Sequence, residues 1–234
     1  MYLGKKIAAI VPARGGSKGV LNKNIKPLLG LPLIGHTLQC ILDTGIIDFV
    51  TVSTDSEKIA AISKEWTNEI IHRPPSLASD TAKGKDVIVH AIDSIKSTVG
   101  NFDYYFYLQP TSPLRSSEDI VNSLAMAIEK QAIFVVGVCE CEHNPMLCNH
   151  LKEDHCLKGF VSERVTGKNR QEFEQFYRIN GAIYLISNEA IELDFYSESS
   201  FAYIMPQERS IDIDTELDFL IAEVLLQREG DKRS

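Results

Sequence analysis

The stretch Ile7-Ala8-Ala9-Ile10-Val11-Pro12-Ala13-Arg14-Gly15-Gly16-Ser17-Lys18-Gly19 joins a short apolar run to a glycine-rich, basic loop, and Lys23-Asn24 follow shortly after. The apolar run is long enough for one strand and too short for most helices. Glycine lets backbone N–H groups approach an anion because no Cβ intervenes, and Arg and Lys add positive charge. A buried strand that leads into such a loop favours a phosphate-binding site.

The loop lacks both common phosphate-binding motifs. The P-loop pattern G-x-x-x-x-G-K-[ST] and the dinucleotide pattern G-x-G-x-x-G are absent from it. An alternative interpretation is therefore a glycine-rich turn whose lysines serve solubility. The loop by itself leaves both interpretations open.

Length and composition indicate a soluble globular protein. The chain has 234 residues, of which 44% are hydrophobic and 24% charged, which suits one large domain. The formal net charge of −8 does not favour binding of nucleic acid or of an anionic membrane. A polyphosphate ligand would need a local basic cluster and a divalent cation.

The N-terminal residues and the cysteines bear on location. Only five apolar residues precede Pro12 after Lys6, so no secretory signal is expected. No apolar run approaches the roughly 20 residues of a membrane span. Five cysteines, an odd number, favour reduced thiols in a cytoplasm.

Strand-like and helix-like segments alternate through the first two thirds of the chain. The strand-like segments are 7–11, 48–53, 69–72, 104–108 and 133–138, and the helix-like segments are 33–45, 57–66, 84–97 and 116–130. The alternation predicts an α/β fold with a mostly parallel sheet covered by helices on both faces. Ligands bind such sheets beyond the carboxyl ends of the strands. The residues just after strands are Arg14, Asp55, Arg73 and Gln109.

The pattern changes in the last third. Residues 140–178 are polar with few periodic apolar positions, and we expect a dimerisation arm or lid inserted within one domain spanning 1–234. Strand character returns at 181–186 and 201–205. The last helix is expected at 215–227, with a frayed tail at 228–234. Its expected inward-facing residues are Leu217, Leu220, Ile221, Val224 and Leu225.

Asp212-Ile213-Asp214 places two carboxylates two residues apart. In an extended segment both would point to one side, where they could share a Mg²⁺ with substrate phosphates. Such an ion would offset the charge of a triphosphate. The alternative is that Asp214 caps the last helix while Asp212 is solvated.

Cysteines and histidines crowd the region from 139 to 156, and zinc is one interpretation of this cluster. However, one residue separates Cys139 from Cys141, whereas zinc sites usually have two to four between paired ligands. Cys139 also ends an apolar strand, where Cys packs as a small hydrophobic residue. The cluster therefore gives zinc little support.

Several motifs occur in one order along nearly the whole chain. They are Ile10–Gly19 with Lys23-Asn24, Val52-Ser53-Thr54-Asp55, Arg73-Pro74 with Leu77–Thr81, Leu108-Gln109-Pro110-Thr111-Ser112-Pro113-Leu114-Arg115, Asn180–Tyr184, and Ser210–Asp214. As an ordered set they resemble the CMP-sialic acid synthetase (acylneuraminate cytidylyltransferase) family. The resemblance implies a Rossmann-like, nucleotide-diphospho-sugar transferase-like fold. It also implies homodimers whose arm reaches the partner's active site.

The resemblance further implies transfer of CMP from CTP to the anomeric hydroxyl of a nine-carbon sugar acid, with release of pyrophosphate and with Mg²⁺ as cofactor. The residues it assigns to the nucleotide are Ala13, Arg14, Gly15, Gly16, Ser17, Lys18, Lys23, Asn24, Arg73 and Ala82. Those it assigns to the sugar are Gln109, Arg170, Asn180 and Tyr184. Asp212 and Asp214 would hold the metal and, with Arg14 and Lys23, carry the chemistry. The hydroxyl proton would leave with the help of Mg²⁺ or of an Asp bound to it.

Two features leave the acceptor sugar open. Leu147 stands where members that activate sialic acid often have Lys, and Gly15-Gly16 is also the loop form of relatives that resemble legionaminic and pseudaminic acid synthetases. The alternatives are therefore the same chemistry on legionaminic, pseudaminic or 3-deoxy-octulosonic acid. A non-catalytic nucleotide-binding regulator is a further alternative.

Overall fold

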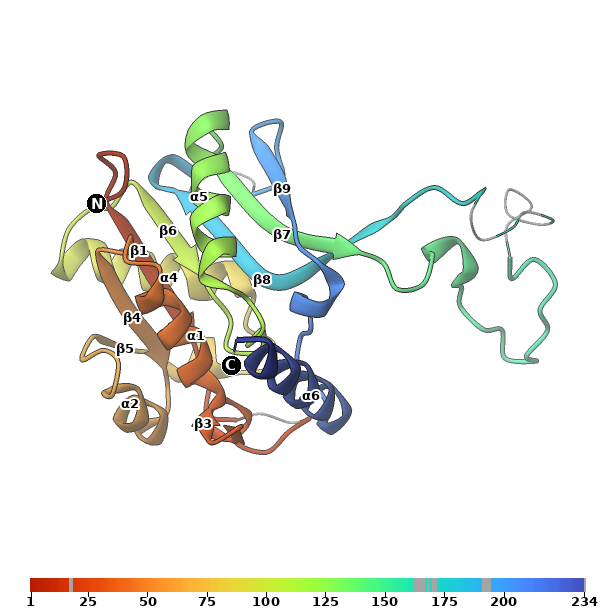
Figure 1. Cartoon of the computed structure of the whole chain (residues 1–234), viewed down its shortest axis with the longest axis horizontal. Helices are drawn as coiled ribbons and strands as arrows, with labels where there is room; N and C mark the ends of the chain where they lie inside the picture. Colours follow the sequence, from red (N-terminus) through yellow and green to blue (C-terminus); the bar gives the residue numbers. More distant parts are fainter. Residues whose placement is uncertain (17–18, 162–166, 168, 170–171, 191–194, 234) are drawn as a thin grey trace.

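A seven-stranded sheet forms the centre of the molecule, which is described here from a computed structural model (Figure 1). The structure describes all residues except 17–18, 162–166, 168, 170–171, 191–194 and 234. In spatial order the strands are β5 (Ile70–His72), β4 (Phe49–Thr54), β1 (Ile7–Pro12), β6 (Tyr104–Tyr107), β8 (Tyr177–Ser187), β7 (Phe134–Glu140) and β9 (Ser200–Ile204). Adjacent strands are parallel except that β8 runs antiparallel to β6 and β7. The mostly parallel sheet is thus confirmed.

Helices cover both faces of the sheet, as the alternation predicts. The helices are α1 (Leu33–Asp43), α2 (Glu57–Ser63), α3 (Pro75–Ala78), α4 (Gly84–Thr98), α5 (Ser117–Lys130) and α6 (Glu216–Arg233). Because successive strand residues point to opposite faces, Ile7, Ala9 and Val11 pack with α1, α2 and α5. Ala8 and Ile10 pack with α4 on the other face (Figure 1).

Shorter elements connect these parts. The first crossover carries a 3₁₀ turn η1 (Lys23–Ile25) and a small antiparallel pair, β2 (Pro27–Leu28) with β3 (Leu31–Pro32). Further 3₁₀ turns are η2 (Pro145–Leu147), η4 (Asn188–Ala190) and η5 (Gln207–Arg209). Among the described residues, no helix is both long and apolar enough to cross a membrane.

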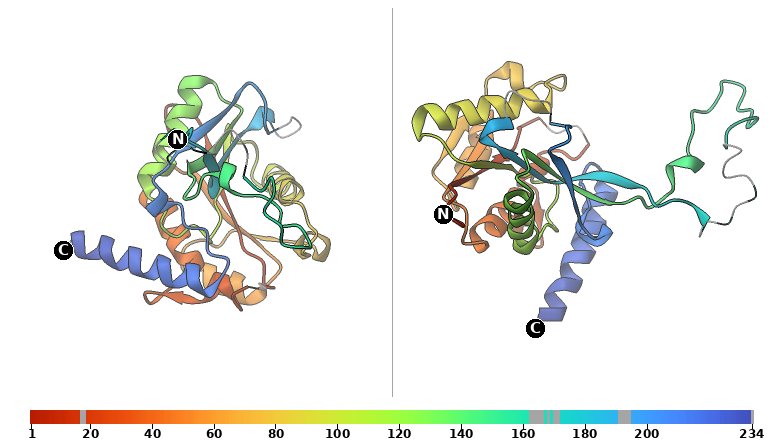
Figure 2. Two further views of the ribbon diagram at one scale, coloured as in Figure 1. Left: turned by 90° about the vertical axis from the view of Figure 1, so that its right-hand side faces the viewer. Right: turned by 90° about the horizontal axis from the view of Figure 1, so that it is seen from above.

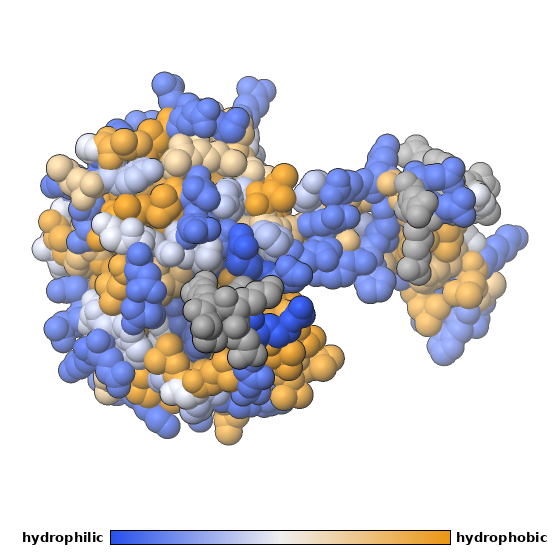
Figure 3. Space-filling view, in the orientation of Figure 1, coloured by the Kyte–Doolittle hydropathy of each residue, from blue (hydrophilic) through white to orange (hydrophobic). Residues whose placement is uncertain are grey.

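Residues 141–176, which we call the arm, leave the sheet between β7 and β8. Figure 1 shows the described residues of the arm extending far from the rest of the molecule, and Figure 3 shows apolar side chains among them at the far end. Leu151 is 56% exposed and Leu157 is 65% exposed. The excursion lies where the irregular segment was expected, while a role in dimerisation stays a prediction.

Helix α6 differs from the expectation in two respects. It continues to Arg233, so a frayed tail from residue 228 was wrong. The expected inward face was also wrong for four residues, which are exposed: Leu217, Leu220, Ile221 and Val224. Phe219 and Ala222 are buried instead, and Leu225 and Leu226 pack beside them against β2 and Leu114. Figure 2 shows the helix projecting from the body, which explains why only one narrow side is covered.

Candidate functional site

A cavity of about 460 Å³ opens at the carboxyl ends of β1, β5 and β6. This is the edge where a mostly parallel sheet binds its ligands. The residues that line it are Pro12, Arg14, Gly19, Lys23, Asn24, Arg73, Tyr107, Gln109, Pro110, Thr111 and Asp214. The glycine-rich loop and Asp214, far apart in sequence, therefore line the same cavity.

The first half of the glycine-rich loop is held by two neighbouring segments. Gly15 N donates a hydrogen bond to Asp55 Oδ1 (2.9 Å), and Asn24 Nδ2 donates to the Arg14 carbonyl (3.0 Å). Arg14 forms an ion pair with Asp80 (2.8 Å). Asn24 is 6% exposed, so its amide acts here mainly as a clamp on the loop.

The second half of the loop touches the aspartate segment. A Cβ on Gly19 would lie 2.1 Å from the Asp214 carbonyl oxygen, a separation that no side chain can tolerate. Lys23 Nζ donates to the Ile213 carbonyl (2.5 Å) and to Asp214 Oδ1 (3.0 Å). One lysine and one glycine thus join the loop to the aspartates.

Asp212 lies half-buried beside the sugar-side candidate Gln109. A Cβ on Gly181, whose φ is +73°, would sit 3.2 Å from Gln109 Oε1 and 3.4 Å from Asp212 Oδ2, so both oxygens flank this glycine. Burial, with a smaller contribution from Asp214, raises the pKa of Asp212, although a hydrogen bond from Thr111 opposes the rise. A bound cation would relieve this desolvation.

The two carboxylates fit a hard divalent cation. Mg²⁺ is commonly bound by one or two carboxylates together with water and substrate phosphates. Among the residues that the structure describes, no group of three or more His, Cys, Asp or Glu is placed to hold a metal. Asp212 and Asp214 are the residues that could hold such an ion together with substrate phosphates.

Asp214 does not cap α6. Thr215 and Asp218 do so reciprocally: Asp218 N donates to Thr215 Oγ1 (3.3 Å), and Thr215 N donates to Asp218 Oδ2 (2.8 Å). The Asp214 side chain is 76% exposed and contacts Lys23. The capping alternative for Asp214 is therefore wrong, and the carboxylate is free to face the cavity.

Arg73 and Tyr107 form the inner wall of the cavity. Arg73 is 8% exposed and its Nη2 donates to the Ser53 carbonyl (2.9 Å). Burial lowers the pKa of Arg73, and burial also raises the pKa of Tyr107 to about 12. At neutral pH the guanidinium stays charged and the phenol stays protonated, so the wall offers a cation and a hydroxyl.

A second cavity of about 340 Å³ adjoins the first. The two share Tyr107 and Gln109. Its lining is mostly aromatic, and the residues are Gly84, Lys85, Ile88, Tyr107, Gln109, Phe134, Tyr184, Phe195 and Tyr196. Two of the expected sugar-side residues, Gln109 and Tyr184, therefore lie on this cavity.

Other expected site residues lie elsewhere. Asn180 is 1% exposed, and its side chain donates to Ser210 Oγ (2.9 Å) and accepts from Ala182 N (3.0 Å), so the structure does not place it against either cavity. Ala13 is buried, with its N–H bonded to the Ser53 carbonyl, and Ala82 N bonds the Ser79 carbonyl. Gly16 has open space around it. Ser17, Lys18 and Arg170 lie outside the described residues.

Four lining or supporting residues were not singled out from the sequence. Tyr107 lies in the predicted strand 104–108 and Thr111 lies three residues after its end, so their closeness to Gln109 in the sequence was the available signal. Phe195 and Tyr196 lie between the two predicted strands 181–186 and 201–205, and no local pattern in the sequence marks them as site residues. The aromatic cavity is therefore a finding of the structure.

The arm carries part of the Cys/His cluster. All five cysteines are free thiols, and Cys148 and Cys156 are exposed. Cys139 is buried in β7, where it packs as the sequence suggests. Nothing among the described residues gathers this cluster into a metal site.

Comparisons with known proteins agree with this geometry. The chain is 33% identical to an N-acylneuraminate cytidylyltransferase of Escherichia coli over 96% of its length, and it spans about half (53%) of that relative. It is 29% identical to a pseudaminic acid cytidylyltransferase of Campylobacter jejuni, with 94% of this chain and 96% of the relative covered.

A solved structure shares the fold. It is a CMP:2-keto-3-deoxy-manno-octonic acid synthetase complexed with CTP, with a TM-score of 0.70 and 15% identity, covering 96% of this chain and 99% of that chain. The sequence model of one family, described as cytidylyltransferase, matches residues 8–225. With that match over most of its length, the chain belongs to the cytidylyltransferase family.

Proposed function

We propose that this protein transfers a cytidylyl group from CTP to the anomeric hydroxyl of a sialic-acid-like nonulosonic acid and releases pyrophosphate. The observation that carries the proposal is the contact of the basic glycine loop with Asp214 at one cavity, through Gly19 and Lys23. Nucleotidyl transfer needs cations at the phosphates and carboxylates for a metal within one space. Family membership and the names of the relatives support the same chemistry.

Arg14 and Lys23 are proposed to bind the triphosphate, with Ser17 and Lys18 in the same loop. Gly15 and Gly16 leave the loop backbone accessible to phosphate oxygens. Arg73, Asn24 and the backbone near Ala13 and Ala82 are the candidates for the cytidine. The position of Arg73 and Asn24 on the cavity supports this assignment.

The reaction forms a bond between the sugar hydroxyl oxygen and the α-phosphorus and breaks the bond from that phosphorus to the bridging oxygen. Pyrophosphate leaves with the bond electrons, and the hydroxyl loses its proton. Asp212 and Asp214 would hold Mg²⁺, which supplies charge neutralisation at the phosphates when bound. Lys23 keeps Asp214 in place and adds a cation at the same edge.

The aromatic cavity is proposed to receive the sugar acid. It adjoins the nucleotide cavity at Tyr107 and Gln109, so a sugar hydroxyl there can approach the α-phosphorus. Tyr184, Phe195 and Tyr196 offer apolar surface for a substituent such as an N-acyl group. Arg170 is the candidate partner of the sugar carboxylate, while Asn180, buried behind the site, is better suited to support it.

The acceptor is proposed as an acylneuraminate, with pseudaminic, legionaminic or 3-deoxy-octulosonic acid as alternatives. The relatives act, by their names, on acylneuraminate or on pseudaminic acid. We also propose that residues 1–234 form a single domain and that it works as a homodimer through the segment 140–178, which the exposed apolar end of the arm supports. Five free thiols are compatible with a reducing cytoplasm.

Pyrophosphate release tests the proposal. Purified protein is incubated with CTP and Mg²⁺ and with each acid in turn, namely N-acetylneuraminic, legionaminic, pseudaminic and 3-deoxy-octulosonic acid. Release with one of them is expected, and the acid with the highest kcat/KM identifies the acceptor. If CTP binds but no acid elicits release, the chain is a nucleotide-binding regulator.

A further inference from the structure

The segment 210–215, which carries Asp212 and Asp214, has no regular secondary structure. In a strand, a ladder of backbone hydrogen bonds would fix the position of each side chain. Here individual contacts must do so instead. Which contacts hold the segment therefore decides where the two carboxylates lie.

Contacts on the cavity side act directly on the aspartates. Ile213 N donates to the Thr111 carbonyl (2.9 Å), and Lys23 bonds Ile213 and Asp214. At the start of the segment, Asn180 Nδ2 donates to Ser210 Oγ (2.9 Å). The preceding turn η5 has its own anchor, which lies outside the cavity.

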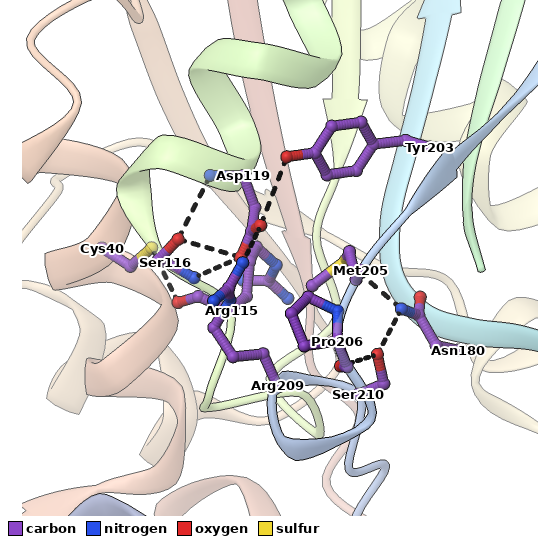
Figure 4. A network of polar contacts seen from close by, with 10 residues as sticks. All are labelled: Cys40, Arg115, Ser116, Asp119, Asn180, Tyr203, Met205, Pro206, Arg209 and Ser210. Atoms are coloured by element: carbon purple, nitrogen blue, oxygen red, sulfur yellow. Dashed lines mark hydrogen bonds and ion pairs between the residues drawn. The ribbon is translucent and has the colours of Figure 1, made fainter. Parts of the chain in front are cut away.

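That anchor is an ion pair between Arg209 and Asp119. Arg209 Nε lies 3.0 Å from Asp119 Oδ2, and Arg209 Nη2 lies 2.9 Å from Asp119 Oδ1. This two-bond geometry fixes orientation as well as distance. Figure 4 shows the pair between the start of α5 and the turn that precedes the aspartate segment.

Asp119 is itself held rigidly. It is 1% exposed, and it accepts hydrogen bonds from Ser116 N (2.9 Å), Ser116 Oγ (2.9 Å) and Tyr203 Oη (3.3 Å). These contacts tie it to the capping box of α5 and to β9. These contacts fix the position of the Asp119 carboxylate, and the Arg209 guanidinium binds to it.

Asp119 is buried and the Arg209 side chain is 32% exposed, so desolvation of the carboxylate offsets part of the attraction between the two charges. A bidentate pair is better suited to fixing geometry, and neither Asp119 nor Arg209 lines the cavity. The direct connection of the pair to the aspartates is the segment that follows Arg209, while Asp119 also interacts electrostatically with Arg115, whose Nη2 donates to the Gln109 carbonyl (2.7 Å).

We propose that the Asp119–Arg209 ion pair is a positioning pair, which sets Asp212 and Asp214 against the Lys23 loop at the spacing that a shared divalent cation requires. The inference rests on the proposed function for its kinetic consequence. Its structural consequence, an ordered segment 210–215, holds without any substrate. Arg209 lies three residues before Asp212, so loss of its anchor lets the first metal ligand shift while the CTP-binding wall at Arg73 and Tyr107 stays in place.

Asp119→Asn, Arg209→Met and the double variant test the pair. Each single change is expected to raise the Mg²⁺ concentration for half-maximal activity and to lower kcat by about 10-fold, the range seen for partners of metal ligands. The KM for CTP should change less than about 3-fold on the same argument. Because the two residues act through one contact, the double variant should be no worse than the worse single variant.

Hydrogen–deuterium exchange of the substrate-free proteins gives the second readout. Peptides covering 207–215 should exchange faster in the variants, while peptides of β1 and β6 should be unchanged. Asp103→Asn is the matched control, because it breaks the Lys5–Asp103 ion pair (3.2 Å). This pair lies at the amino ends of β1 and β6, whereas the cavity lies at their carboxyl ends. It should alter neither the Mg²⁺ dependence nor exchange at 207–215.

The outcomes separate the two proposals. Folded variants with wild-type Mg²⁺ dependence and wild-type exchange at 207–215 would overturn the positioning role. If wild-type protein releases no pyrophosphate with any acid, the proposed function fails, and the exchange result alone then decides whether the pair orders the segment. Should Arg209→Met not fold, Arg209→Lys keeps the charge but loses the two-bond geometry, and it is expected to show the same selective rise in Mg²⁺ requirement.

Discussion

Gly19 is the residue at which the two halves of the candidate site touch. Its missing side chain allows the loop to lie against the Asp214 carbonyl, where a Cβ would be 2.1 Å away. Backbone oxygen cannot move aside as a flexible side chain can. The closeness of loop and aspartate therefore depends on one hydrogen atom in place of a methyl group.

Gly19→Ala is expected to lower kcat/KM by about 100-fold, because the loop must move by an ångström or so and misplacement on that scale is costly. Steady-state pyrophosphate release measures the loss. Gly230→Ala in α6 is the control, since nothing lies within 4 Å of the added methyl and the residue lines neither cavity. Equal effects of the two substitutions would contradict the contact.

Asp212→Asn is expected to lower kcat by at least about 10³-fold while the Kd for CTP changes only a few-fold, because the charge is needed at the reacting phosphate and not at the base or ribose. Calorimetric titration with CTP measures binding, and pyrophosphate release measures turnover. Turnover near the wild-type rate would remove Asp212 from the mechanism.

At the scale of single elements, the local hydrophobic pattern predicts most strands and helices. In α6 this pattern predicts the helix but not which of its faces is buried. Its residues Phe219, Leu220, Ile221, Ala222, Val224, Leu225 and Leu226 are apolar nearly all round the helix. Periodicity then selects no single face. In the folded protein, Phe219 and Ala222 are the buried residues of the helix, and they pack in one cluster with Leu28 and Leu33. The sequence of the helix alone does not reveal this contact.

The packing of α6 predicts unequal effects along it. Phe219→Ala should lower the free energy of unfolding by about 3–5 kcal/mol, the usual range for a buried Phe. Leu220→Ser, at a position that is 57% exposed, should change it by less than about 0.5 kcal/mol. Urea unfolding of both variants measures the difference, and the reverse order would mean that the helix packs on its other side.

The first turn of α5 should make stability depend on pH. Burial alone would raise the pKa of Asp119, but hydrogen bonds from Arg209 and Ser116 outweigh it and hold the pKa below its usual range. The folded state therefore favours the ionised form. Its stabilisation is complete above the unfolded pKa of about 3.9 and is lost as the pH falls through the lower folded value.

Urea unfolding of the wild type and of Asp119→Asn between pH 3 and pH 7 tests this. The wild type should be the more stable at pH 7, and the difference should shrink steadily below about pH 4, where the unfolded carboxyl binds a proton. A difference that stays constant down to pH 3 would show that Asp119 does not carry the linkage.

At the scale of the whole molecule, the sequence predicts the sheet edge and much of its lining. Strand ends place Arg14, Arg73 and Gln109 there by the rule for parallel sheets. The contact of Lys23 with Asp214 spans 191 residues, and no local spacing can foresee it, so only the ordered motifs suggested it. Burial of Asn180 and the aromatic cavity depend on how β8 packs, which motif order does not describe.

The arm carries the last prediction. If the proposed homodimer forms through the arm, Leu151→Glu with Leu157→Glu is expected to shift it to monomer, because charges in an apolar contact are costly. Light scattering after size exclusion measures the mass at several concentrations. A wild type that stays monomeric at micromolar concentration would refute the dimer, and a variant that stays dimeric would place the contact elsewhere.

The reversed direction of β8 has a consequence for how this fold can diversify. Since β7 leaves the sheet at the edge that carries the candidate site and β8 re-enters at that same edge, the segment between them starts and ends at this edge. A change in its length or sequence leaves the order and direction of the central strands as they are. The fold can thus vary this one hairpin independently of the strands that position the cavity.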